Sequence, residues 1–152
     1  MPLKRVQQFI NQYPDLKIVL FDSSTHTADL AAQALGVTPG QIAKTLVFIL
    51  DGQQPVVVVT CGDRKVNVKQ LAKILGGKKA RFASADTVME LTGFPPGGVS
   101  PIGLLQIVPV YLDESLYNYD VVYAAAGTAN SALPVMPERL REITGAKVIN
   151  VC

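Results

Sequence analysis

The chain has 152 residues, a formal net charge of +2, 49% hydrophobic residues and 17% charged residues. This size and composition predict one globular domain over residues 1–152 and exclude a disordered chain. The longest apolar runs are too short to cross a bilayer, and the N-terminus lacks the pattern of a signal peptide. Two cysteines and one histidine form no ligand or disulfide pattern. We therefore expect a cytoplasmic protein with no membrane contact, no metal and no cofactor.

The first part of the chain predicts two helices and three strands. Apolar residues at helical spacing begin it, and the polar run DSSTHT offers capping residues for a second helix that Gly36 ends. DGQQ predicts the turn of a hairpin whose strands show no polar alternation, so both faces should be covered. In chain order the elements are a helix at 3–13, a strand at 17–21, a helix at 29–36, a short helical turn within 37–44, and strands at 45–50 and 55–61.

Caps and turn residues mark out the rest of the chain. The helix after Asn67 is expected to face the core with four apolar residues, Val68, Leu71, Ile74 and Leu75. In chain order the elements are a helix at 68–75, a strand at 80–83, a helix from Ser84 through Leu91 closed by Gly93, strands at 104–113, 119–127 and 131–135, a helix from Pro137, and a strand at 147–151. This pattern predicts an α+β, or mixed α/β, domain with a curved mixed β-sheet flanked by helices.

Half of the 14 lysines and arginines lie in residues 64–81, a segment without Asp or Glu. A solvated helix face explains such a run, and so does a surface that attracts phosphates, as nucleic-acid binding requires. The residues alone leave both readings open. The segment carries Arg64, Lys65, Lys69, Lys73, Lys78, Lys79 and Arg81.

The sequence contains none of the familiar catalytic patterns GxSxG, HExxH, Walker A or GxGxxG. His26 lies in a polar turn, where it is expected to cap a helix or face solvent. Cys61 ends an apolar strand and is expected to be an inert buried thiol. Asp113 and Glu114 are expected to be exposed in a turn. These residues predict no nucleophile paired with a general base.

Lys44 stands directly before a strand that is expected to be buried. Its ammonium must either reach solvent or occupy a partly desolvated site. One reading is an ordinary lysine at the edge of a sheet. The other is a fixed positive charge that binds an anion or polarises a carbonyl.

Residues 91–104, LTGFPPGGVSPIGL, form what we call the Gly/Pro loop, in which seven of fourteen residues are Gly or Pro. Gly97 and Gly98 let a ligand approach their N–H groups closely, and three prolines restrict the loop. Consecutive rigid amides can hold an anion or an oxyanion, although a purely structural turn also fits.

A second run of small residues, 124–132, directly follows a predicted strand. Gly127 permits close approach of the backbone, and hydroxyl and amide side chains surround it. This run is either a set of ligand contacts or a simple hairpin loop. The polar side chains are those of Thr128, Asn130 and Ser131.

Taken together, four segments resemble one family. They are GVTPGQIAKTLVF, CGDRKVNVKQLAKILGGKKARFAS, LTGFPPGGVSPIGL and AAAGTANSALPVMPERLREITGAKVINV. Their order and spacing are similar to those of the YbaK/prolyl-tRNA-synthetase-associated editing domains. The resemblance covers residues 25–151 and leaves 1–24 as an N-terminal helix and strand. Because the chain has none of a synthetase's other parts, it resembles the free-standing, trans-acting type.

Members of that family hydrolyse aminoacyl-tRNAs that carry the wrong amino acid. The resemblance therefore implies an aminoacyl-tRNA deacylase whose partner is the acylated 3′ end of a tRNA, with an aminoacyl-tRNA synthetase as a further partner. It places catalytic roles on Lys44 and Gly98, and tRNA contacts on the basic residues from Arg64 to Lys79. Water would be the nucleophile, with the aminoacyl group held by the loop amides. The implied substrate-binding residues are Thr45, Gly97, Val99, Ser100, Gly127, Thr128 and Asn130.

One departure from the family affects the expected substrate. Cysteine-specific relatives carry a Ser-Gly pair where this chain has Ala125–Ala126, and a basic-Gly pair near Ala129–Asn130. The pocket should therefore be more apolar, and alanine, serine, threonine or another small amino acid becomes as plausible as cysteine, on tRNA-Pro or another tRNA. The alternative function is a non-catalytic protein of the same fold that binds tRNA or nucleotides.

Overall fold

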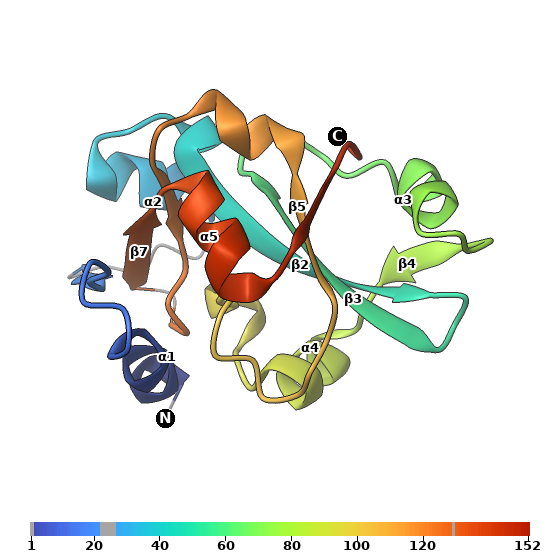
Figure 1. Cartoon of the computed structure of the whole chain (residues 1–152), viewed down its shortest axis with the longest axis horizontal. Coiled ribbons are helices and arrows are strands. Elements are labelled where there is room, and N and C mark those ends of the chain that lie inside the picture. The colour runs from blue at the N-terminus through green and yellow to red at the C-terminus, as the bar shows by residue number, and fades with distance from the viewer. Residues whose placement is uncertain (1, 22–26, 129) are drawn as a thin grey trace.

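The computed structural model describes residues 2–21, 27–128 and 130–152 (Figure 1). Its helices are α1 (Pro2–Ile10), α2 (Ala28–Leu35), α3 (Val68–Ile74), α4 (Ala85–Thr92) and α5 (Pro137–Thr144), and 3₁₀ turns span Pro39–Gln41, Pro96–Gly98 and Glu114–Asn118. Its strands are β1 (Val19–Leu20), β2 (Ile42–Leu50), β3 (Gln54–Cys61), β4 (Ala80–Phe82), β5 (Val110–Asp113), β6 (Val122–Ala124), β7 (Ser131–Val135) and β8 (Lys147–Ile149). His26 lies outside the described residues.

Within this part of the chain the strands form one mixed sheet in the order β1-β7-β6-β2-β3-β5-β8, and β4 pairs with β2. β2 and β3 form the predicted antiparallel hairpin, whereas β6 pairs with β2, and β5 with β3, in parallel. The mixed α/β fold class is confirmed. Helix α2 and strand β7 lie at one end of the long axis, and α3 and β4 at the other (Figure 1). None of the described helices is long and apolar enough to span a membrane.

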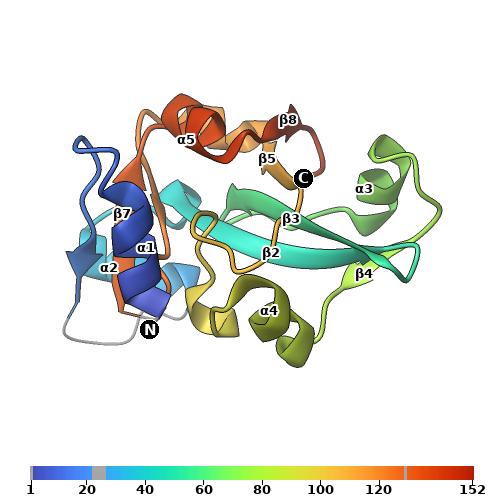
Figure 2. The ribbon, with the colours of Figure 1, turned by 60° about the horizontal axis from the view of Figure 1, so that its bottom comes forward.

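The β2–β3 hairpin is covered on both faces, as its sequence predicts. One face contributes Val47 and Val57 to a core shared with α1, α4, α5 and the Gly/Pro loop, and the other packs Phe48 and Val58 against α3. Figure 2 shows α4 lying along one side of the hairpin. Each large apolar side chain that is fully buried contributes about 1.5–3 kcal/mol. The hairpin is therefore a rigid base for the site built on its edge.

The predicted helix caps are confirmed. Asn67 Oδ1 accepts a hydrogen bond from Gln70 N–H at 3.1 Å, and Ser84 Oγ accepts one from Thr87 N–H at 3.2 Å. The expected inward orientation of Ile74 is wrong, because this side chain is 42% exposed. Helix α3 ends at Ile74, and the residue after it packs against the core instead.

Several predicted strands are longer than the observed ones, among them 17–21, 80–83 and 147–151, and the excess is largest in two others. The run 104–113 is a strand only as β5, because the N–H groups of Leu105 and Gln106 donate to carbonyls at the end of α4, and Pro109 has no N–H for a sheet. The run 119–127 shortens to β6, which pairs with β7 in an antiparallel hairpin, and the residues after β6 belong to the loop that joins the two strands. The predicted N-terminal helix also ends earlier, at Ile10.

Asp113 is buried, with 1% of its surface exposed, so the expectation of an exposed turn is wrong. Its carboxylate accepts hydrogen bonds from the N–H groups of Ser115 and Val151, at 3.0 and 2.9 Å, and from the Ser115 hydroxyl. The carboxylate thus ties β5 to the C-terminal segment. Cys61 is buried as expected, and burial raises the pKa of its thiol.

Candidate active site

The site lies at a gap in the sheet, on the edge of β2 that faces away from β3. Ile42 C=O accepts from Gly62 N–H on the β3 side, so the odd-numbered residues of β2 direct their N–H and C=O groups to the opposite edge. On that edge, pairing with β6 stops at Ala43 and pairing with β4 begins only at Phe48. Among the described residues no strand pairs with 44–46 there, so the backbone N–H and C=O of Thr45 face the gap.

A cavity of ≈ 220 Å³ opens at this gap. Helix α2, the first half of β2, the Gly/Pro loop and the β6–β7 hairpin supply its walls, and most lining side chains are small or apolar. The volume is below the range of about 300–1,000 Å³ typical of sites for drug-sized ligands. The cavity therefore suits a small chemical group. The described lining residues are Thr27, Ala28, Ala31, Leu35, Ile42, Ala43, Lys44, Thr45, Leu46, Pro96, Val99, Tyr123, Ala124, Ala125, Thr128, Ser131 and Ala132.

Thr45 carries the sharpest chemical signal in the cavity. Its side chain is buried, with 9% exposed, and its Oγ1 is the one buried side-chain oxygen or nitrogen in the described residues that has no hydrogen-bond partner. An unpartnered buried hydroxyl costs about 1–3 kcal/mol, so native proteins rarely keep one without a use. Thr45 also lines the cavity, so this residue lies beside the space that a ligand would occupy.

Lys44 is half-buried and is the only charged side chain among the described residues that line the cavity. The ion pairs found in this part of the chain join Arg139 to Asp15 and Arg141 to Glu138, so Lys44 has no carboxylate partner within it. An ammonium that is not neutralised by a carboxylate can attract an anion or polarise a carbonyl in the adjoining cavity.

The Gly/Pro loop contributes Pro96 and Val99 to the wall. A Cβ atom on Gly98 would lie 2.7–2.8 Å from backbone atoms of Thr128, so only glycine lets the loop and the β6–β7 hairpin touch. The Gly98 N–H donates to Pro95 C=O at 2.8 Å within the 3₁₀ turn. The expectation that Gly98 offers a free amide to a ligand is therefore corrected, and its structural contribution is close packing.

Gly97 lies in the same turn, between Pro96 and Gly98. Ser100 is fully buried and does not line the cavity, and its Oγ accepts from Ile102 N–H at 3.2 Å. Its hydroxyl closes a turn behind the wall. The loop itself therefore uses the Ser100 hydroxyl, and a ligand contact through the Ser100 backbone stays a prediction.

The β6–β7 hairpin is both a hairpin loop and a cavity wall. Gly127 adopts φ +103, a conformation that favours glycine, and is buried behind the wall. The Thr128 hydroxyl lies 2.8 Å from Asn130 Oδ1, to which it donates, and 2.9 Å from Ser131 Oγ. Thr128 lines the cavity, whereas Asn130 is exposed and donates from Nδ2 to Phe21 C=O at 3.4 Å. Ser131 lines the cavity although the resemblance assigned it no role.

Helix α2 is the wall that sequence reasoning missed. Thr27 Oγ1 accepts from Leu30 N–H at 3.2 Å and starts the helix, and Gly36 ends it at φ +71. Three of its residues, Ala28, Ala31 and Leu35, line the cavity at helical spacing. The available signal was the pair of small residues three apart on one face, but that pattern also marks an ordinary core helix.

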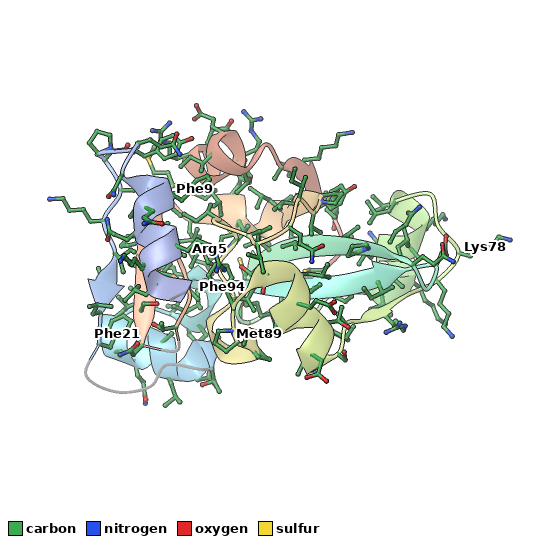
Figure 3. All side chains as sticks on the ribbon, turned by 90° about the horizontal axis from the view of Figure 1, so that it is seen from below. Arg5, Phe9, Phe21, Lys78, Met89 and Phe94 are labelled. Carbon is green, nitrogen blue, oxygen red and sulfur yellow. The ribbon has the colours of Figure 1, made fainter. Side chains whose placement is uncertain are left out.

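The basic residues are exposed, as a charged surface requires. Arg64 follows the end of β3, which pairs with the start of β2 beside the cavity. The basic strip then extends along α3, where Lys69 and Lys73 line a shallow groove, to the far end of the molecule at Lys78 (Figure 3). The exposed residues of this strip are Arg64, Lys65, Lys69, Lys73, Lys78 and Lys79.

Known proteins are similar to this chain in sequence and in fold. The sequence profile of the aminoacyl-tRNA editing domain matches residues 22–143. The uncharacterised protein YwhH of Bacillus subtilis (strain 168) is 38% identical over 100% of this chain and 98% of its own length. EbsC of Enterococcus faecalis (strain ATCC 700802 / V583), described as a candidate Cys-tRNA(Pro)/Cys-tRNA(Cys) deacylase, is 32% identical over 82% of this chain and 76% of its own.

A solved structure described as a candidate trans-editing enzyme for prolyl-tRNA synthetase superposes with a TM-score of 0.91 at 37% identity, covering 99% of this chain and 96% of that one. The fold is therefore shared with that candidate trans-editing enzyme. This chain belongs to the aminoacyl-tRNA editing domain family.

Proposed function

We propose that this protein is a trans-acting deacylase that hydrolyses the ester of tRNA carrying a small wrong amino acid. The observation that carries the proposal is that Lys44 and Thr45 line the same small cavity, and that the buried hydroxyl of Thr45 has no hydrogen-bond partner in the described residues. Membership of the editing-domain family supports it, as do relatives described as candidate deacylase and trans-editing enzymes.

The reaction asks little nucleophilic chemistry of the protein, because an aminoacyl ester is already activated. Water attacks the carbonyl carbon, the bond from that carbon to the ribose oxygen breaks, and the ribose oxygen leaves with a proton. The products are a free amino acid and an uncharged tRNA. Positioning the ester and stabilising the oxyanion are the tasks left to the site.

The side chains and backbone of β2 are suited to those tasks. Lys44 holds the phosphate of the terminal adenosine or the carbonyl region of the ester as a fixed positive charge. The N–H of Thr45, directed at the gap, is an oxyanion donor of the kind first expected from Gly98, and its hydroxyl binds the aminoacyl group. Losing one such donor typically raises the barrier by on the order of 3–4 kcal/mol. The terminal ribose hydroxyl assists proton transfer.

The walls favour a small, weakly polar amino-acid side chain. Ala28, Ala31, Ala124 and Ala125 line the cavity, so no polar group from these positions contacts the substrate side chain. Ala125 stands where cysteine-specific relatives have a more polar pair. One methylene changes binding by only about 1–3 kcal/mol in an apolar pocket, so several small amino acids should be accepted to different degrees.

The exposed basic strip supplies the remaining attraction for tRNA. Lysines and arginines that meet phosphates release counterions, which makes affinity fall as salt rises. The strip starts beside the cavity, so an acceptor stem following it would present its 3′ end to Lys44. In this arrangement Gly97, Gly127 and Asn130 shape the two loops that flank the acylated end.

The test is a panel of mischarged tRNAs, among them Ala-tRNA(Pro), Ser-tRNA(Pro) and Cys-tRNA(Pro), with Pro-tRNA(Pro) as the correctly charged control. We expect hydrolysis of at least one small mischarged species well above the spontaneous rate, and none of the control. Binding of all four without hydrolysis of any would instead indicate a non-catalytic tRNA-binding protein.

A further inference from the structure

The side chain of Arg5 on helix α1 hydrogen-bonds to the Gly/Pro loop. Its Nε donates to Gly103 C=O and its Nη2 to Thr92 C=O, each at 2.7 Å. The guanidinium carbon lies 4.4 Å from the centroid of the Phe94 ring, and Figure 3 shows the two side chains next to each other beside α1. One guanidinium therefore binds both ends of the loop and stacks on its buried aromatic residue.

These contacts hold the two ends of the loop together. The Thr92 carbonyl also accepts from Leu105 N–H at 3.1 Å, so the two ends of the loop are bonded directly as well as through Arg5. A Cβ atom on Gly93 would lie 2.9 Å from Arg5 Cζ, which explains a glycine at this position beyond its φ of +75. The segment between the ends is a compact loop with a pinned base.

The contacts that Arg5 makes with the loop are not needed to hold helix α1 against the core. Helix α1 is already anchored by Val6 and Ile10, which are fully buried in the core. Arg5 has no carboxylate partner among the described residues. Its half-buried guanidinium instead donates to two backbone carbonyls and stacks on the Phe94 ring. The Thr92 carbonyl ends α4, where the helix dipole favours a cation.

We propose that Arg5 is a positioning residue for deacylation, holding the Gly/Pro loop so that Pro96 and Val99 keep the cavity wall in place. This inference rests on the proposed function. Arg5 is not among the described residues that line the cavity and acts through the loop, whose Gly98 packs on the backbone of Thr128 in the opposite wall. Residue 5 also lies outside the segment 22–143 matched by the family profile, so this role is not part of what that match implies.

The test compares Arg5→Ala and Arg5→Lys with Arg139→Ala. Arg139 is a matched control because it also stacks on an aromatic ring, that of Tyr13 at 5.2 Å, and bonds to Asp15 on the N-terminal segment, away from the loop. Two readouts are taken, amide hydrogen exchange of residues 94–103 and single-turnover deacylation. Free guanidinium at millimolar concentration is added to the Arg5→Ala variant as a rescue.

We expect faster exchange in residues 94–103 of both Arg5 variants, with the β2 and β3 amides unchanged. The single-turnover rate constant at saturating protein should fall about 10- to 100-fold, with a smaller change in the protein concentration that gives half of this rate, because a displaced wall misplaces the bound ester. Guanidinium should restore part of the rate to Arg5→Ala. Arg139→Ala should leave both loop exchange and deacylation at wild-type values.

Unchanged loop exchange in the Arg5 variants would overturn the inference, whatever their activity. Faster exchange with wild-type deacylation would also overturn it and would leave the proposed function standing. A rate loss matched by uniformly faster exchange across β2 and β3 would show general unfolding and contradict a local role. If the wild-type protein deacylates no mischarged tRNA, the proposed function fails by that measurement, and the positioning role fails with it even where Arg5 still orders the loop.

Discussion

Replacing Thr45 with valine should make the free protein more stable and the enzyme slower. Valine has nearly the shape of threonine but no hydroxyl, and Thr45 Oγ1 is buried without a partner. Removing that hydroxyl removes a desolvation cost of about 1–3 kcal/mol, so we expect the free energy of unfolding to rise by about 1 kcal/mol. For a chain of this length the melting temperature should rise by about 2–4 °C.

In the proposed function, the same substitution removes a hydrogen bond to the bound aminoacyl group. We expect single-turnover deacylation to fall by roughly 10- to 100-fold, which corresponds to about 1.4–2.7 kcal/mol. Urea unfolding measures the first effect, and hydrolysis of a mischarged tRNA measures the second. An increase in stability combined with a loss of rate is the signature of a polar group kept for function.

Thr60→Val is the matched control. Thr60 is also fully buried, on the neighbouring strand opposite Lys44, but its hydroxyl lies 2.9 Å from Cys152 Sγ. Losing this partnered hydroxyl should lower stability by about 0.5–1.5 kcal/mol and leave deacylation unchanged. The reasoning is refuted if Thr45→Val destabilises the protein as Thr60→Val does, or if it deacylates at the wild-type rate.

Three further predictions concern the Gly/Pro loop, the basic strip and the dependence of the free energy of unfolding on pH in the acid range. Gly98→Ala should lower the free energy of unfolding by about 1–3 kcal/mol in urea, because the new Cβ meets the Thr128 backbone, and wild-type stability would show that the two walls do not touch. Replacing Lys69, Lys73, Lys78 and Lys79 with alanine should weaken tRNA binding in filter assays. The slope of log K against log salt concentration should become shallower by about 0.7–0.9 for each phosphate that the protein no longer neutralises. An unchanged slope would show that the strip is not part of the interface. Hydrogen bonds from the backbone N–H groups of Lys79 and Lys78 lower the pKa of Asp51 below its ordinary value of 3.8, so its stabilising effect is present above that value and lost as pH falls through the lower folded-state pKa. Asp51→Asn should therefore make urea stability depend less on pH in that acid range, and an unchanged acid limb would contradict the assignment.

The local elements of the fold were predictable because their signals are local. Asn67, Ser84, Gly36 and Gly93 mark helix ends by hydrogen bonds or backbone conformations that involve only neighbouring residues. The run 131–135 is confirmed with its limits as β7. Where prediction failed, a distant partner decided the outcome. Asp113 is buried because Val151 donates to it from 38 residues away.

The candidate site was likewise predictable only where its signals are local. Lys44 was singled out by its residue type and position and by the resemblance, Thr45 by the resemblance alone, and both line the cavity. The gap that exposes the backbone of Thr45 depends on where β6 and β4 stop pairing with β2, which no local pattern encodes. The roles of helix α2 and Arg5 were missed for the same reason. Helix α2 meets the cavity, and Arg5 meets the Gly/Pro loop, through residues that are far apart in the sequence.

The central claim is that the ammonium of Lys44 and the cavity beside it hydrolyse the aminoacyl ester, and single-turnover deacylation by Lys44→Ala tests it most directly. Lys147→Ala, which removes an exposed lysine on β8 at the opposite edge of the sheet, controls for the loss of one charge. We expect Lys44→Ala to lose about 100-fold or more of the rate while remaining folded, and Lys147→Ala to match the wild type. A folded Lys44→Ala variant that deacylates at the wild-type rate would contradict the claim.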